Sequence, residues 1–370
     1  MISIIQHDNV YRNIESGLNW FVCNNNSLRF NTDTNIYTFG DTIRIRKEKW
    51  GVLSILKASS FDRALHSGFL CCSHQLTIKD TNLYLADKHR RLVLCGSTDL
   101  SGNIQLPKSG LTIGHFAGQM YTGEYSLPLE VPTNQFIPKC KDIYQKELVL
   151  RIEQSERVSM EYLLGNKMHS FFSCTKYFLS KNALLLDKIQ LEGNVILHSL
   201  DKLIISKDCK LDNVIVIAPE VFIEDNFKGR LQVFAKKKII LGKNIHLGFP
   251  SALFLSLDKK ESHMNSLYIG ANSEVNGNIV GVSKQQQELI MTLDKNIRIN
   301  GQVYWNGVII QNGSDINGIL YLNLFKINTN ASVYMNYLKD FKLRNDSMVF
   351  FEDVINHDDE SISYPIEVCY

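Results

Sequence analysis

Three short apolar runs recur 18 positions apart in the stretch Leu203–Leu241, LIISKDCKLDNVIVIAPEVFIEDNFKGRLQVFAKKKIIL. They are Leu203–Ile205, Val221–Ile223 and Ile239–Leu241, and a second β-rich run lies between each and the next. The first and third residues of each run share one side of a strand, because side chains alternate along a strand. A repeat this short cannot bury its own apolar face. The pattern therefore predicts that successive repeats stack on one another.

Similar runs continue as far as Phe325–Ile327, with the period slipping between 239 and 308, where 249–264 and 283–288 look like inserted loops. We predict a mainly β protein, with a parallel β-helix (solenoid) of about seven coils over residues 184–343. Ile205, Ile223 and Leu241 should form one interior column. An antiparallel sandwich is the competing fold. The short, even strands without two-residue hairpin turns favour the β-helix.

Three further regions flank the predicted β-helix. Residues 1–22 carry an apolar stripe at helical spacing, Val10, Ile14 and Leu18, and are predicted to form a helical stem that serves an anchor or partner. Residues 27–180 are predicted to be a mixed, β-rich region. Residues 344–370, with the acidic run His357–Glu360, are predicted to be a mobile tail.

The bulk composition excludes several classes of protein. Of 370 residues, 44% are hydrophobic, which excludes a disordered chain, and a net charge of +2 gives no electrostatic argument for nucleic acid. No window has the ~18 uninterrupted apolar residues of a membrane span, and the N-terminus has no signal-peptide features. If Met1 is the true start, we expect a cytoplasmic protein. The eight cysteines are expected to be free, partly buried thiols.

Candidate catalytic and metal-binding residues are few. We find no metal or cofactor motif: Cys71, Cys72 and His74 form C-C-S-H, but no second ligand pair lies at a zinc-site spacing. Asp208 and the Glu224–Asp225 pair recur about one coil apart, as the paired acids of a β-helix glycosidase would. Their turn positions indicate solvated acids instead, so no catalytic residue is predicted.

Two other sets of side chains have a structural and a functional interpretation. The alternating segment Thr42–Lys49 places four basic side chains on a predicted strand. We expect them to form a solvated face, and the alternative is an anion-binding patch. These residues are Arg44, Arg46, Lys47 and Lys49. Aromatic residues gather in the last coils, and Tyr304 and Tyr321 are one coil apart. They form either internal packing or a surface for a partner or glycan. These residues are Tyr304, Trp305, Tyr321, Tyr334 and Tyr337.

One coil resembles a known family. Residues Ile269–Ile279 have the spacing I-G-x-x-S-x-V-x-G-x-I, which resembles bactofilin-like proteins, bacterial β-helices that form polymers. Gly301–Leu343 and Leu92–Gly123 resemble uncharacterised surface proteins of Bacteroidota, which are similar in layout to pilus-assembly (pseudopilin-like) proteins. That resemblance implies a membrane helix upstream of Met1, a stem at Tyr11–Phe21 and a β-rich body in the cell envelope.

We therefore expect a non-enzymatic structural or adhesive cell-envelope protein. Its expected partners are proteins or further copies of itself, with a glycan as a further possibility and nucleic acid excluded. Two alternatives remain open at this point. One is a carbohydrate-active β-helix enzyme, and the other is a cytoplasmic scaffold that polymerises end to end.

Overall fold

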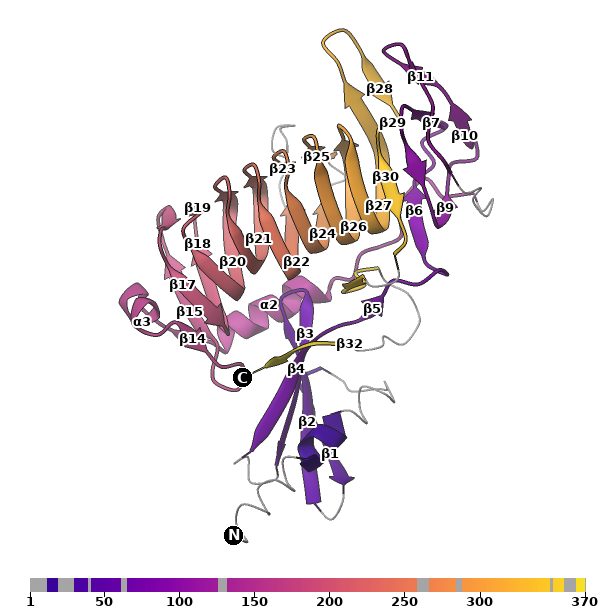
Figure 1. The fold of residues 1–370 in the computed structure, drawn as a ribbon. Helices are drawn as coiled ribbons and strands as arrows, with labels where there is room; N and C mark the ends of the chain where they lie inside the picture. The colour runs from indigo at the N-terminus through magenta and orange to yellow at the C-terminus, as the bar shows by residue number, and fades with distance from the viewer. Residues whose placement is uncertain are drawn as a thin grey trace.

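The solenoid forms the body of the molecule (Figure 1). The computed structural model describes residues 12–18, 30–38, 41–60, 65–125, 132–257, 266–283, 288–346, 349–355 and 364–369. The chain is mainly β, with 59% strand and 8% helix, and a parallel β-solenoid of about 11 turns spans residues 81–326. The predicted fold class is confirmed. The coils outnumber the predicted seven because strands before residue 184 also join the stack.

Within the described residues, 20 strands form one continuous sheet that winds around the solenoid, and almost all of its neighbours pair in parallel. A three-stranded sheet completes the coils at one end, in the order β10 (Leu111–Ile113), β7 (Leu92–Cys95) and β29 (Tyr337–Lys339). The strands of the large sheet are β6 (Thr81–Leu85), β8 (Asp99–Leu100), β9 (Asn103–Gln105), β13 (Glu156–Arg157), β14 (Met168–His169), β15 (Lys176–Ser180), β16 (Leu184–Leu186), β17 (Gln190–Gly193), β18 (Val195–Ser199), β19 (Lys202–Ile205), β20 (Lys210–Ile223), β21 (Lys228–Leu241), β22 (His246–Leu257), β23 (Leu267–Ile269), β24 (Glu274–Ser283), β25 (Leu289–Leu293), β26 (Ile297–Ile310), β27 (Ser314–Asn328), β28 (Val333–Met335) and β30 (Lys342–Arg344).

Smaller elements surround these coils. They are β5 (His74–Gln75), β7 (Leu92–Cys95), β10 (Leu111–Ile113), β11 (His115–Phe116), β12 (Gln119–Met120), β29 (Tyr337–Lys339) and β31 (Phe350–Phe351), and the helices α2 (Ile143–Glu153) and α3 (Met160–Gly165).

The interior of the solenoid is built from columns of apolar side chains. Ile205 pairs with Ile223, and Ile223 with Leu241, and each of the three is at most 2% exposed. The column continues through Ile269 to Leu293 on the following coils. The predicted stacking is therefore confirmed, and it follows from the alternation of side chains along each strand.

One corner of the solenoid is a ladder of asparagines: Asn226, Asn244, Asn272 and Asn296. All four have positive φ angles, between 56° and 68°. Asparagine tolerates this left-handed conformation better than other non-glycine residues, so it suits a tight corner. From Asn244 onward, each side-chain amide donates to the side-chain oxygen one coil back, at 3.0, 3.3 and 3.0 Å. We call this column the asparagine ladder.

The solenoid is closed by a segment from early in the chain. β6 pairs in parallel with β27, where Leu83 lies opposite Leu320. Residues 81–125 therefore form the far end of the stack, beyond the coils that end the repeat region (Figure 1). Residues 132–155, which include α2, then return along the outside of the coils to the other end, where the next coil begins. We call this segment the strap.

Both ends of the solenoid are covered by the chain itself. At one end α3 lies against the coils, with Leu163 fully buried in the solenoid core (Figure 1). At the other end Tyr121 and Tyr125 pack on the same core, and Tyr125 forms a bridge to Leu100. Within the described residues, the solenoid core is therefore covered by side chains of other segments at both ends.

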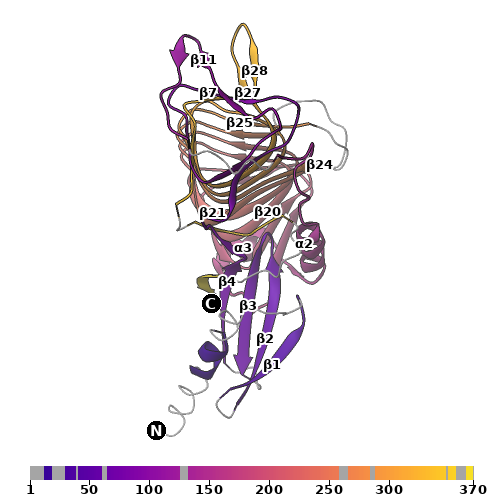
Figure 2. The same ribbon diagram turned by 90° about the vertical axis from the view of Figure 1, so that its right-hand side faces the viewer.

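A five-stranded antiparallel sheet projects from one side of the solenoid (Figure 2). It has the order β1–β2–β3–β4–β32, with β1 (Asp33–Thr38), β2 (Asp41–Trp50), β3 (Leu53–Ser60), β4 (His66–Cys72) and β32 (Tyr364–Cys369). We call it the accessory sheet.

Two predictions about the chain's ends are wrong for the residues that the structure describes. Residues 12–18 are helical, but Ile14 and Leu18 are fully buried against Ile43, Ile45 and other side chains of the accessory sheet. They pack on the body and do not project as a stem; the remainder of 1–22 lies outside the described residues. The predicted tail also contributes β31 and β32, both paired in sheets. The acidic run at 357–360 lies outside the described residues.

Candidate functional site

One outer face of the solenoid is apolar and covered by other parts of the chain. Phe234, Phe254 and Val280 occupy one outward column and are at most 6% exposed. Tyr144 of the strap helix α2 packs against Phe254 with their rings 6.2 Å apart. This covered face acts as a second core, which joins solenoid, strap and accessory sheet.

Buried amides on the covered face hold backbone segments as a neighbouring strand would. Gln232 accepts from the Val52 N–H at 2.7 Å and donates to the Trp50 carbonyl at 2.9 Å. Asn278 accepts from the Glu352 N–H at 3.1 Å and donates to the same residue's carbonyl at 2.7 Å. The outward amides thus satisfy backbone groups that would otherwise be buried without a partner.

A buried ion pair lies at the same junction. The Lys49 Nζ is 2.7 Å from Glu352 Oε1, with the two side chains 4% and 5% exposed, and it also donates to Ser54 Oγ at 3.1 Å. Nearby Lys47 is 7% exposed, and burial lowers the pKa of its amine. The prediction of a solvated basic face is therefore wrong for Lys47 and Lys49, because the strap and residues 349–355 cover that end of β2.

The predicted aromatic surface consists mostly of buried side chains. Trp305 is fully buried in the solenoid core, and Tyr304 and Tyr321 lie on the covered face at 3% and 7% exposure. Tyr334 and Tyr337 are half-buried and pack edge-on against each other, with ring centroids 5.1 Å apart. The first three residues do not offer a binding surface, since their packing is internal.

The other sequence candidates do not come together either. Asp208, Glu224 and Asp225 are exposed at turns, where an Asp225 oxygen accepts from the Lys243 N–H at 2.8 Å. In the C-C-S-H segment both thiols are buried, and burial raises the pKa of Cys71 to about 12. His74 instead lies 2.9 Å from Asp80.

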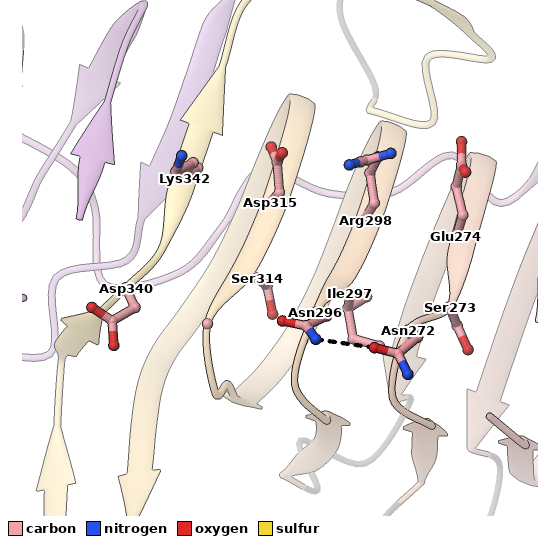
Figure 3. A pocket seen from close by; sticks show the side chains of 11 residues that line it. Asn272, Ser273, Glu274, Asn296, Ile297, Arg298, Ser314, Asp315, Asp340 and Lys342 are labelled. Atoms are coloured by element: carbon pink, nitrogen blue, oxygen red, sulfur yellow. Dashed lines mark hydrogen bonds between the residues drawn. The ribbon is translucent and has the colours of Figure 1, made fainter. Parts of the chain in front are cut away.

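A second outer face is polar and uncovered, and here we place the candidate site. Its central column consists of residues paired across successive coils, which alternate in charge from Glu274 onward. Figure 3 shows four of them side by side, all projecting from the same side of the sheet. We call it the polar face; its column is Lys228, His246, Glu274, Arg298, Asp315 and Lys342.

A hollow of about 480 Å³ lies where the polar face meets the asparagine ladder (Figure 3). The ladder stops at Gly313, the corner residue after Asn296, which has a φ of +73° but no side chain to continue the amide chain. Asp340 follows on the next coil. Ser314, which also lines the hollow, has a buried hydroxyl with no partner in the described part of the chain. We call this cavity the ladder hollow.

The acids of the ladder hollow have partners. Asp315 receives two hydrogen bonds from Arg344, at 2.8 and 3.1 Å. Glu274 accepts from the amides of Asn276 and Asn300 at 3.2 and 3.4 Å and lies 3.5 Å from His246.

Unlike these acids, the two cations of the hollow have no partner among the described residues. Arg298 and Lys342 are exposed and take part in no ion pair or side-chain hydrogen bond with any residue that the structure describes. The arrangement can therefore bind an anion without first breaking an internal contact. Sequence reasoning missed these two residues because inserted loops make the steps between coils unequal.

A scan against protein-family models, a search of curated proteins and a search of solved structures each gave no match to this chain. Among the described residues, no helix is long and apolar enough to cross a membrane. The described residues also contain no group of three or more His, Cys, Asp or Glu side chains arranged to hold a metal ion.

Proposed function

We propose that this chain is a non-enzymatic structural or adhesive protein of the cell envelope, in which a rigid solenoid presents its polar face to an extended ligand. One observation carries the proposal. The chain covers the solenoid's two ends and its apolar face with its own segments, and among the residues that the structure describes it leaves a charged face several coils long exposed.

The covered ends favour this function over end-to-end polymerisation. Solenoids that stack on one another need apolar terminal coils that can meet, whereas terminal segments with polar outer surfaces keep such proteins monomeric. Here Leu163 closes one end, and Tyr121 and Tyr125 close the other. The bactofilin-like polymer therefore ranks below the adhesive function.

The partnered acids favour a binding role over hydrolysis. A glycosidase needs one carboxyl group free to donate a proton and another free to act on water or sugar. On the polar face, Asp315 accepts from two guanidinium nitrogens of Arg344, and Glu274 accepts from two amides. An assignment as a carbohydrate-active enzyme would require these contacts to break first.

The test is cosedimentation of the purified chain with insoluble polymers, namely peptidoglycan sacculi, cellulose, chitin and crosslinked hyaluronan. The supernatants are analysed for released sugars by mass spectrometry. We expect sedimentation with at least one polymer and no released product. Turnover of any polymer, or the absence of binding to all four, would contradict the proposed function.

A further inference from the structure

We infer that the ladder hollow binds an acidic polysaccharide that carries a carboxylate on every second sugar. Arg298 and Lys342 bind two successive carboxylates of this ligand. This inference rests on the proposed function and names the ligand class of the same face. Its basis is the geometry of the hollow, the spacing between its two cations and the fact that neither cation forms an ion pair with another residue that the structure describes.

The volume and lining of the hollow suit a short saccharide segment. At about 480 Å³ it falls within the ~300–1,000 Å³ range of small-molecule sites. It is lined by amides, hydroxyls and carboxylates, which are the groups that hydrogen-bond sugar hydroxyls. The oxygens of Glu274 and Asp315 can accept from such hydroxyls while they keep their internal contacts, because each carboxylate oxygen accepts more than one bond.

The spacing of the cations determines where the ligand's charges lie. Arg298 pairs with Asp315, and Asp315 with Lys342, so the two cations are two coils apart. Neighbouring coils are separated by ~4.8 Å, which places the cations roughly 10 Å apart along the solenoid. That distance is close to the length of a disaccharide in a linear glycan. A carboxylate on each sugar would instead meet Asp315 at every second position and be repelled.

The break in the asparagine ladder opens the hollow. A Cβ at Gly313 would meet only the Asp340 carbonyl oxygen at 3.4 Å and the Asp340 Cβ at 3.8 Å, which are ordinary contacts. Asparagine tolerates the φ of +73° found there. Gly313→Asn should therefore continue the ladder and narrow the hollow without disturbing the coil. The hydroxyl of Ser314, in the wall of the hollow, is buried and has no partner among the described residues.

The experiment measures binding of defined hexasaccharides by calorimetry at low ionic strength. A hyaluronan hexasaccharide supplies uronates on alternate sugars, hexagalacturonate supplies one on each sugar, and chitohexaose is uncharged. We expect the hyaluronan hexasaccharide to bind most tightly. The double variant with Arg298→Gln and Lys342→Gln should bind the hyaluronan hexasaccharide about ten-fold or more weakly. Gly313→Asn should also weaken it while leaving the melting temperature unchanged or higher.

Lys228→Gln is the control for a loss of charge elsewhere on this face, because it removes one positive charge from the same column, three coils from Arg298. It should change the affinity by less than about two-fold. Equal binding of chitohexaose, tighter binding of hexagalacturonate, no hexasaccharide binding, or full affinity in the Arg298 and Lys342 variant would each overturn the inference. If that variant still sediments with an insoluble polymer, the adhesive function survives and only the site assignment fails.

Discussion

The buried pair Lys49–Glu352 offers the sharpest test of how the accessory sheet is held to the solenoid. Glu352→Gln keeps the side chain's shape and leaves the backbone bonds to Asn278 in place. It removes the negative charge 2.7 Å from an amine whose side chain is 4% exposed. Breaking one partner of a buried ion pair costs about 3–5 kcal/mol, because the remaining charge has no compensation.

The expected shift in melting temperature follows from the size of the chain. Unfolding entropy is about 2.1 cal/mol/K per residue, so a chain of 370 residues that melts as one unit has roughly 0.8 kcal/mol/K. A loss of 3–5 kcal/mol then lowers the melting temperature by about 4–6 °C. Differential scanning calorimetry measures this shift directly.

Two control variants separate the cost of leaving a buried charge unpaired from the cost of substituting these side chains or of losing any ion pair. Replacing both partners, Lys49→Met with Glu352→Leu, removes both charges and should cost far less than the single change. Glu156→Gln breaks the surface ion pair between Glu156 and Lys176, in which the Glu156 side chain is 53% exposed. This change should lower the free energy of unfolding by less than about 1 kcal/mol. If Glu352→Gln melts with wild type, or if the double replacement is as damaging as the single one, the junction does not depend on this ion pair.

Three further predictions concern the interior, the N-terminal helix and a buried thiol. Ile223→Asp places a charge without a partner between Ile205 and Leu241 and should cost several kcal/mol; an unchanged melting curve would refute the column. Leu18→Ala should cost about 2–5 kcal/mol by urea titration, because the side chain is fully buried, whereas a projecting stem would show no loss. Cys71 has a pKa raised by burial from 9.0 to about 12, so between these values the unfolded chain loses this proton while the folded chain keeps it. Stability should therefore fall as pH rises through that window, by up to about 1.4 kcal/mol per pH unit, and the fall should be smaller in Cys71→Ala; equal slopes would contradict this account.

The sequence predicted what depends on local periodicity. Strand alternation and the step of 18 were sufficient to place Ile205, Ile223 and Leu241 in one column. The same reasoning failed on the polar face, where the steps from His246 to Glu274, Arg298 and Asp315 are 28, 24 and 17 residues. Insertions between strands change the count of residues without changing the stacking, so a fixed period cannot find these neighbours.

Contacts between distant segments were also beyond prediction. Lys49 reads as a solvated strand residue because its partner Glu352 lies 303 positions away. The strap likewise covers Tyr304, whose hydroxyl donates to the Pro138 carbonyl 166 positions earlier at 2.8 Å. An aromatic on the outside of a coil is exposed or buried according to what covers it, and periodicity carries no information about the cover.

The closure of the stack by residues 81–125 has a consequence for the order of folding during synthesis. The amide of Asn82 bonds the Gly318 carbonyl across 236 positions of chain, so this end segment leaves the ribosome long before the coil that receives it. Solenoids with sequential contacts can grow from any nucleus, one repeat at a time. Here the final docking must wait for nearly the whole chain and close a very long loop, which slows folding and leaves a strand edge unpaired meanwhile. A circular permutant that begins at residue 132 and ends at residue 131, with the natural termini joined by a linker, would place residues 81–125 after the coil that receives them, and it should refold faster than the natural chain.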